Sequence, residues 1–311
     1  MRVVLALVFS IVFFIPTSFA ADGTDTDFDD DGRDDITVYR PANGTWYIFS
    51  TSRGETLSYQ WGLPGDIPLP GQYSDNIRPD LGVYRPSNGF WYMRQWDSSL
   101  EFSEQLAVQW GGFEGDIPVP CNYNGSSRQD IGIYRSGNWF VKHAPSFSDS
   151  SIDIRAWGMP GDTPVQSDYD DDDQCDYAVF RAGTWHILLS SKDYETAASI
   201  GWGSAGDVPI PGDFDGDRMH DFAIYREGEQ SLWSIRESST QGLTTINIRW
   251  GTFGDVPLAS DVDGDNKSDI IVWRPSNGTW YALLSNDNYQ SVNVMQFGLE
   301  GDIPLGQDLG R

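Results

Sequence analysis

Four loops of the sequence carry aspartates at positions 1, 3, 5 and 9. They are Asp27, Asp29, Asp31 and Asp35; Asp168, Asp170, Asp172 and Asp176; Asp213, Asp215, Asp217 and Asp221; and Asp261, Asp263, Asp265 and Asp269. Closely spaced carboxylates repel one another, but on a tight loop they can converge on one hard cation, to which the carbonyl of position 7 adds an oxygen. Calcium fits these ligands better than zinc, because no cysteine or histidine cluster accompanies them. The pattern predicts about four Ca²⁺ sites.

These loops differ from the EF-hand calcium loop at position 12. The EF-hand has a bidentate glutamate there, whereas this chain has Val38, Val179, Ile224 and Val272. Without that ligand, each site is expected to bind calcium weakly, as extracellular modules do. The alternative is a solvated acidic turn without an ion, and four matching copies make it the less favoured interpretation.

Two further loops keep only the ninth aspartate. Their residues at positions 1, 3, 5 and 9 are Gln72, Ser74, Asn76 and Asp80, and Asn122, Asn124, Ser126 and Asp130. Neutral amides and hydroxyls can bond a loop to itself. We expect no ion in these two loops.

The elements that must position the loops form a repeat of 45 to 50 residues. An aromatic–arginine pair ends at Arg40, Arg85, Arg135, Arg181, Arg226 and Arg274, and a Gly-Asp-x-Pro motif contains Asp66, Asp116, Asp162, Asp207, Asp255 and Asp302. One tryptophan per repeat is Trp46, Trp91, Trp139, Trp185, Trp233 or Trp280, and an aromatic–glycine pair begins at Trp61, Trp110, Trp157, Trp202, Trp250 or Phe297. Six hits on four markers establish internal repetition, which at this period indicates a solenoid, a propeller or an array.

Short alternating strands decide between these architectures. Residues 81–85 lead through a turn to an aromatic strand that starts at residue 90, and residues 106–110 and 117–120 supply two more. Four short antiparallel strands per repeat describe one blade of a β-propeller. We therefore predict an all-β propeller of six four-stranded blades, with the first blade completed by the C-terminal strand. The predicted repeats are 21–62 with 297–311, 63–111, 112–158, 159–203, 204–251 and 252–296.

The repeat resembles the bacterial VCBS/FG-GAP repeat and is similar to the blades of integrin α-subunit propellers. Residues 27–35 match the Asp-x-Asp-x-Asp-Gly-x-x-Asp spelling of that family, including Gly32, and the other three acidic loops carry a variant of it. The literal Phe-Gly and Gly-Ala-Pro elements are replaced by Trp-Gly and Tyr-Arg-Pro, which limits closeness to integrins. The resemblance implies an extracellular, adhesive, calcium-binding propeller, and it implies no particular ligand.

The N-terminus and the net charge restrict where the protein acts and what it contacts. Residues 1–20 have the layout of a cleaved signal peptide, which predicts a secreted or periplasmic protein and a mature domain of residues 21–311. A net charge of −26 disfavours nucleic acid and anionic lipid as partners. We expect no membrane insertion and a monomer.

Several other residues have a structural and a functional interpretation. The once-per-repeat arginines could form an anion-binding ring, but structural ion pairs with the once-per-repeat aspartates are favoured. Trp96 has no counterpart in other repeats; local packing is favoured over a ligand contact at the surface. Cys121 and Cys175 are predicted, with about equal weight, to form a disulfide between neighbouring repeats or to be two buried thiols.

The sequence contains no constellation that indicates catalysis. The three histidines fall at unrelated positions of the repeat, and nucleophile-elbow, zinc-protease and phosphate-loop motifs are absent. A binding or adhesion module for a glycan or protein is the leading hypothesis. A purely structural calcium-rigidified domain is second, and an enzyme that uses the channel face of the propeller is third.

Overall fold

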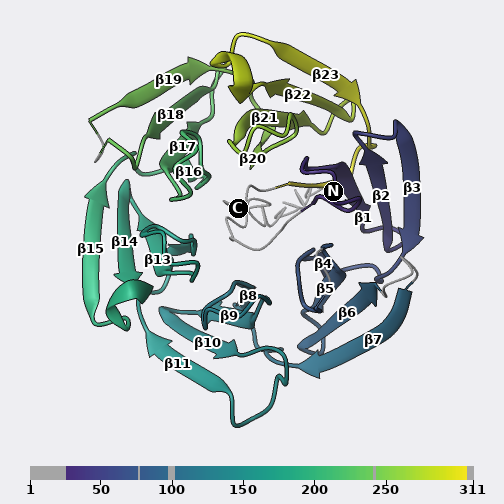
Figure 1. Cartoon of the computed structure of the whole chain (residues 1–311), viewed down its shortest axis with the longest axis vertical. Coiled ribbons are helices and arrows are strands. Elements are labelled where there is room, and N and C mark those ends of the chain that lie inside the picture. The colour runs from purple at the N-terminus through teal and green to yellow at the C-terminus, as the bar shows by residue number, and fades with distance from the viewer. Residues whose placement is uncertain (1–25, 76–77, 97–101, 241–242, 307–311) are drawn as a thin grey trace, which may run out of the picture.

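A computed structural model describes residues 26–75, 78–96, 102–240 and 243–306. They form six four-stranded antiparallel sheets arranged as blades around a ring (Figure 1). Blade 1 holds β24 (Ile303–Leu305), β1 (Ile36–Arg40), β2 (Thr45–Ser50) and β3 (Glu55–Gln60); blade 2 holds β4 (Ile67–Pro68), β5 (Leu81–Arg85), β6 (Phe90–Trp96) and β7 (Phe102–Gln109). Blade 3 holds β8 (Ile117–Pro118), β9 (Ile131–Arg135), β10 (Asn138–Lys142) and β11 (Ile152–Ala156).

Blade 4 holds β12 (Thr163–Pro164), β13 (Tyr177–Arg181), β14 (Thr184–Leu189) and β15 (Thr196–Gly201). Blade 5 holds β16 (Val208–Pro209), β17 (Phe222–Arg226), β18 (Leu232–Arg236) and β19 (Thr245–Arg249), and blade 6 holds β20 (Val256–Ser260), β21 (Asp269–Arg274), β22 (Thr279–Leu283) and β23 (Val292–Gln296). Short 3₁₀ turns follow β14 (η1, Ser190–Lys192) and β22 (η2, Ser285–Asp287). The predicted fold class is confirmed.

The first blade is closed by the other end of the described chain. β24 pairs antiparallel with β1, with Thr37 opposite Leu305 and Tyr39 opposite Ile303. In the other blades, the Gly-Asp-x-Pro segment supplies the corresponding inner strand, which ends at its proline in blades 2 to 5 and continues to Ser260 in blade 6. Proline fits there because the inner strand is a sheet edge, where a ladder hydrogen bond is not required of every residue.

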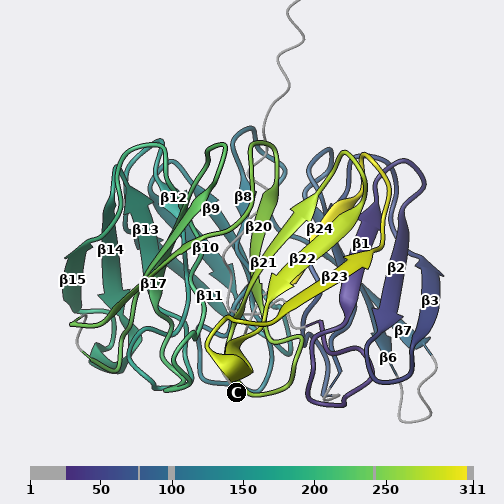
Figure 2. The same cartoon turned by 90° about the horizontal axis from the view of Figure 1, so that it is seen from above.

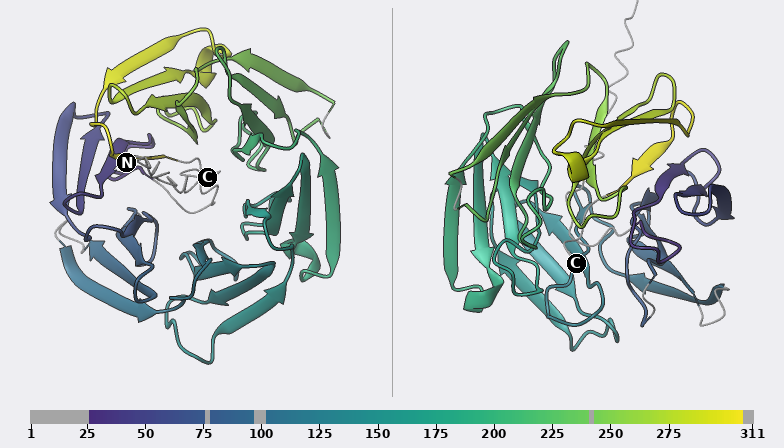
Figure 3. Two further views of the ribbon diagram at one scale, coloured as in Figure 1. Left: turned by 180° about the vertical axis from the view of Figure 1, so that it is seen from behind. Right: turned by 45° about the horizontal axis from the view of Figure 1, so that its top comes forward.

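The loops lie at two opposite ends of the strands (Figure 2). The acidic loops, each of which comes directly before the second strand of a blade, lie at one end. The connections between the third and fourth strands lie at the same end, which we call the acidic face. The hairpins between the second and third strands and the aromatic–glycine turns share the other end, which we call the turn face; Figure 3 shows the ring from behind and in a tilted view. The metal candidates therefore all belong to one face.

Tryptophans connect each blade to the next. The six tryptophans at the start of the third strands are buried, with exposed fractions of 0–3%. The aromatic–glycine tryptophans reach across the blade boundary: their Nε1 atoms donate to main-chain carbonyls of the following blade, as from Trp110 to Phe140 and from Trp202 to Ser234 at 2.9 and 3.0 Å. Large apolar rings with a polar end suit this position, because the ring is buried while the N–H finds a partner.

A chain of main-chain hydrogen bonds joins the loops of the acidic face. The position-8 N–H of a loop donates to the position-1 carbonyl of the preceding loop: Asp34 to Asp261, Gln129 to Gln72, Cys175 to Asn122, His220 to Asp168 and Ser268 to Asp213, at 2.6–2.9 Å. Between blades 1 and 2 this bond is missing because position 8 is Pro79, which has no N–H. There, Arg78 Nη2 donates to the Asp29 carbonyl at 3.2 Å instead.

The predicted signal peptide, residues 1–20, lies outside the described residues. None of the helices in the described ranges has the length and apolar character needed to cross a bilayer.

Candidate metal centres on the acidic face

The position-1 aspartate folds each intact loop around its own carboxylate. In blade 5, Asp213 Oδ1 accepts from the Gly216 N–H at 2.6 Å and Oδ2 from the Arg218 N–H at 2.8 Å. Gly216 and Arg218 have φ of 83° and 74°, so the chain curls tightly here. Asp27, Asp168 and Asp261 accept equivalent main-chain bonds in their own loops. The tight turn brings the alternate carboxylates to one side.

The ninth aspartate holds its loop to the connection between the third and fourth strands. Asp221 Oδ2 accepts from the Phe214 N–H at 2.9 Å, and Oδ1 accepts from the Ser238 N–H at 2.6 Å. Asp35, Asp176 and Asp269 make the same two kinds of bond. These side chains have a structural task in addition to any metal ligation.

Three carboxylates of each intact loop converge. One ligand oxygen from each lies within 4.8 Å of the others in the groups Asp27, Asp29 and Asp31; Asp168, Asp170 and Asp176; Asp213, Asp215 and Asp221; and Asp261, Asp263 and Asp265. The fourth predicted ligand of each loop is not part of its group of three. These residues are Asp35, Asp172, Asp217 and Asp269. The structure thus brings together twelve of the sixteen predicted ligands in triads and keeps the other four adjacent.

Three of these loops have a carboxylate oxygen without a hydrogen-bond partner, which a cation could satisfy. Asp29 Oδ1, Asp170 Oδ1 and Asp263 Oδ1 are buried, and none has a hydrogen-bond partner. All three belong to position 3. A buried carboxylate oxygen without a partner costs free energy unless a cation or a donor satisfies it. The donor set consists of carboxylates and main-chain carbonyls, which is the chemistry that calcium prefers.

The acidity of the ninth aspartates reflects their burial. Burial is the main cause that raises the pKa of Asp35 and Asp176 to about 7 and that of Asp221 and Asp269 to about 8, and neighbouring carboxylates raise it further. A divalent cation between the carboxylates would oppose both effects, because it favours the charged form.

Serines that the sequence analysis did not single out also bind the acidic loops. Ser190 Oγ donates to Asp172 and Asp176 at 2.9 and 2.8 Å, and Ser238 Oγ donates to Asp217 at 3.0 Å. Ser285 Oγ donates to Asp265 at 2.8 Å, and Ser50 Oγ donates to Asp29. Each serine follows the third strand of an intact blade or ends it. The position of Ser190, Ser238 and Ser285 is Thr51 in blade 1, beside Ser50, and it is Trp96 in blade 2 and Ala144 in blade 3. A hydroxyl at this position therefore accompanies the carboxylates, which the sequence could have revealed.

Blade 2 replaces carboxylates with a neutral network. Asp80 accepts from the Tyr73 N–H at 3.1 Å, the Trp96 N–H at 3.3 Å and Ser74 Oγ at 3.1 Å. Trp96 is only 6% exposed, and its Nε1 donates to the Pro79 carbonyl at 2.9 Å. Of the two interpretations of Trp96, the structure has the favoured one, local packing: the ring fills space between blades 1 and 2. Residues 97–101, which follow Trp96, lie outside the described residues.

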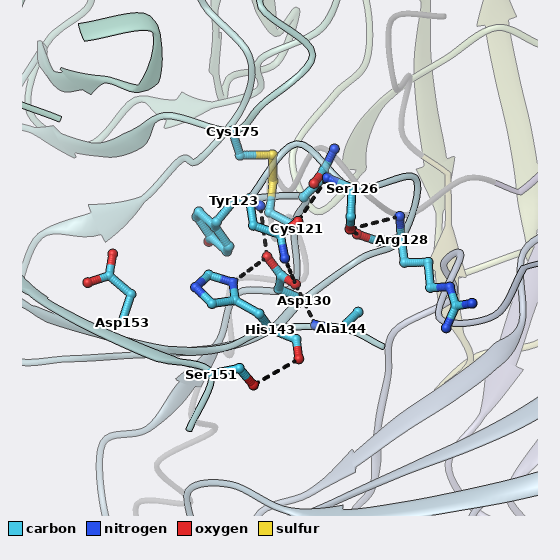
Figure 4. Close-up of polar contacts among 12 residues, drawn as sticks. Cys121, Tyr123, Ser126, Arg128, Asp130, His143, Ala144, Ser151, Asp153 and Cys175 are labelled. Atoms are coloured by element: carbon cyan, nitrogen blue, oxygen red, sulfur yellow. Dashed lines mark hydrogen bonds and ion pairs between the residues drawn. A yellow bond between two sulfur atoms is a disulfide. The ribbon is translucent and has the colours of Figure 1, made fainter. Parts of the chain in front are cut away.

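Blade 3 brings a histidine to the place of the missing ligands (Figure 4). His143 Nδ1 lies 2.9 Å from Asp130 Oδ2, and Asn124 Nδ2 donates to Asp130 Oδ1 at 3.3 Å. The hydrogen bond to Asp130 is the main cause that raises the pKa of His143, and burial opposes it. A protonated imidazole supplies one positive charge beside the ninth aspartate, where an intact loop collects several carboxylates.

Blades 3 and 4 are joined covalently on this face. Cys121 and Cys175 form a disulfide with their Cα atoms 6.1 Å apart, and Figure 4 shows it directly above the Asp130 network. The sequence left open a disulfide or two buried thiols, and the structure contains the disulfide. Both cysteines are buried, at 0% and 1% exposure.

The recurrent arginines form the structural ion pairs that were favoured over an anion-binding ring. On the turn face each arginine pairs with the aspartate of the Gly-Asp-x-Pro motif: Arg40–Asp302, Arg85–Asp66, Arg135–Asp116, Arg181–Asp162, Arg226–Asp207 and Arg274–Asp255. The aspartate side chains are only 1–2% exposed. The pairs connect the inner strand of each blade to the second strand.

Comparison with known proteins supports the β-propeller fold but assigns the chain to no particular family. No protein-family model and no curated protein sequence matches the chain. Among solved structures, a lectin from Agrocybe aegerita, described as specifically recognising non-reducing terminal N-acetylglucosamine, is similar over 86% of this chain and 78% of its own, with a TM-score of 0.58 and 13% identity. BBS1N, solved in complex with ARL6DN, is similar over 89% of this chain and 84% of its own, with a TM-score of 0.51 and 11% identity. Both neighbours are propellers, and the chain is a six-bladed member of this fold.

Proposed function

We propose that this protein is a secreted or periplasmic, calcium-stabilised propeller of the VCBS/FG-GAP type that acts as a binding or adhesion module for a glycan or protein. The observation that carries the calcium part is the set of buried position-3 oxygens, on Asp29, Asp170 and Asp263, that have no hydrogen-bond partner within carboxylate triads. Residues 1–20 support export, and an exported protein meets millimolar calcium in many environments.

Calcium serves stability in this proposal. A site without the EF-hand glutamate binds with a Kd of about 10⁻⁴ M. At about 1 mM calcium such a site adds roughly 1.4 kcal/mol, and four add about 6 kcal/mol. This rivals the whole net stability of a typical domain, about 5–15 kcal/mol.

Binding is supported by the scaffold and by the neighbours of the fold. A ring of rigid blades presents loops at both faces, and binding residues concentrate on loops that a rigid scaffold positions. One neighbour is described as a lectin and another was solved with a protein partner, so the fold is compatible with either ligand class. A purely structural exported domain is the second candidate, and we propose no enzymatic activity.

The test is a glycan array and a protein-interaction screen with the mature chain, each in 1 mM calcium and in excess EGTA. Specific, saturable binding in calcium supports the proposal. Absence of any such binding in both screens, from a chain shown to be folded, favours the structural alternative. Turnover of a bound ligand would overturn the non-enzymatic assignment.

A further inference from the structure

One of the six repeated ion pairs on the turn face differs from the others. Arg85 binds Asp66 through two bonds, Nε to Oδ1 at 2.7 Å and Nη2 to Oδ2 at 2.8 Å. The same bidentate pairing is made by Arg40, Arg181, Arg226 and Arg274. Arg135 donates to Asp116 through Nε alone. Among the contacts of the described residues, the terminal nitrogens of its guanidinium have no hydrogen-bond partner.

A local insertion explains the difference. The turn from Trp110 to Asp116 is one residue longer than the aromatic–glycine turns of the other blades, and it contains consecutive glycines at 111 and 112 with φ of 111° and 98°. The longer turn places the Phe113 ring under the guanidinium of Arg135, with Cζ 4.4 Å from the ring centroid. The Phe140 ring also contacts it, at 5.0 Å. The two rings fix the plane of the guanidinium while its terminal donors remain free.

These residues line a pocket between blades 2 and 3 of about 320 Å³. Its walls are Trp110, Ile133 and Phe140, its polar groups are Arg135 and Gln109, and Phe113, which is 67% exposed, stands at its rim. The volume is at the small end of ligand pockets, about 300–1,000 Å³. It suits one ring-sized group better than an extended chain.

The buried Asp116 carboxylate at Nε offsets the charge of Arg135, so a ligand carboxylate would be held here by the donor geometry of the terminal nitrogens, and the other acidic groups lie farther away. The acidic loop of blade 3 and Arg135 lie at opposite ends of β9, whose five residues span about 17 Å at 3.3 Å per residue. This is about twice the screening length of roughly 8 Å at physiological ionic strength. Glu114 is on the same turn but is not among the residues that line the pocket.

Resting on the proposed binding function, we infer that this pocket binds the carboxylate of an acidic sugar residue, such as a uronic acid unit of an exported or surface polysaccharide. The free edge of the Arg135 guanidinium matches a carboxylate in the geometry of its donors. The aromatic walls accept the C–H face of a sugar ring, and the Gln109 amide can bind a hydroxyl. A protein ligand is the less favoured occupant, because the pocket has room for only one ring-sized group.

The experiment compares methyl β-glucuronide with methyl β-glucoside, which differ only by the carboxylate, in calorimetric titrations and ligand-observed NMR. We expect the glucuronide to bind at least about tenfold more tightly. We expect Arg135→Lys to abolish that preference, because lysine lacks the planar donor fork. Arg181→Lys, at the equivalent position of blade 4, is the matched control and should leave it unchanged. Phe113→Ser changes an exposed side chain and should weaken glucuronide binding several-fold without unfolding the chain.

Equal binding of the two sugars, no glucuronide binding at millimolar concentration, or equal effects of the two lysine variants would overturn the inference. So would tighter binding of a peptide with a free C-terminal carboxylate than of the glucuronide. If a ligand found on the glycan array bound Arg135→Lys as tightly as the parent, this pocket would not be its binding site. The proposed binding function would still be supported.

Discussion

The loops of blades 1, 4, 5 and 6 and those of blades 2 and 3 occupy equivalent places and share only the ninth aspartate. In all six, that carboxylate accepts one main-chain N–H from its own loop and one from the end of the third strand or the connection after it. Positions 1, 3 and 5 are carboxylates only where a serine faces them from that connection. The ninth aspartate is therefore part of the scaffold of every loop, although Asp176 and Asp221 also belong to carboxylate triads. Positions 1, 3 and 5 are the ones that blades 2 and 3 have replaced.

Removing calcium with a chelator should produce the largest change in stability among these predictions. With four intact loops, excess EGTA is expected to remove about 6 kcal/mol of stability relative to 1 mM calcium. Scanning calorimetry measures the drop in melting temperature, and isothermal titration should count four sites rather than six. An unchanged melting curve in EGTA would contradict the assignment of calcium to these loops.

Removing a ninth aspartate should differ from removing a ligand at position 3. Asp80→Ala leaves two buried main-chain N–H groups without their acceptor and should cost roughly 2 kcal/mol, since the loss of a buried carboxylate offsets part of the penalty. This cost should be the same with and without calcium. Asp215→Asn should cost about 1.4 kcal/mol in 1 mM calcium and almost nothing in EGTA.

Denaturant unfolding of both variants in both buffers makes this measurement. If Asp80→Ala destabilised the protein only in calcium, the loop of blade 2 would hold an ion. If Asp215→Asn destabilised it equally in EGTA, position 3 would be structural and not a ligand.

The smallest effect concerns pH and His143. Its folded pKa is raised above the unfolded value of about 6.5, so the folded state binds the proton more tightly. The resulting stabilisation is fully present below about pH 6.5 and is lost as the pH rises through the folded pKa. The difference in unfolding free energy between the parent and His143→Gln should therefore shrink above about pH 6.5. A difference that stays constant between pH 5 and 9 would show that the imidazole acts as a neutral hydrogen-bond partner.

The periodic part of the structure could be predicted from the sequence. Six blades, the closing strand and the Arg–Asp pairs are readable because every copy has the same neighbours, so that one spacing repeats six times. The carboxylate triads follow for the same reason, since their residues lie within one short loop.

Features that depend on contacts between distant segments could not be predicted. The partner of the ninth aspartate lies 14 to 17 residues away across a hairpin, as from Asp221 to Ser238. Trp96 was singled out because it is unique, yet its burial depends on Pro79 and on the neighbouring blade. The free edge of Arg135 depends on where one inserted residue sends the Phe113 ring, which no spacing reveals.

The pairing of β24 with β1 also determines how the ring responds to tension. The two strands are antiparallel, so the end of β24 at Leu305 lies beside Thr37, near the start of β1. A force that separates the two ends of the chain would therefore peel the strands apart from one side, one hydrogen bond at a time, instead of shearing all of them together. The bidentate pair of Arg40 with Asp302 lies at the far side of this pairing and would be the last contact to break. The ring would therefore open at low force when pulled by its two ends.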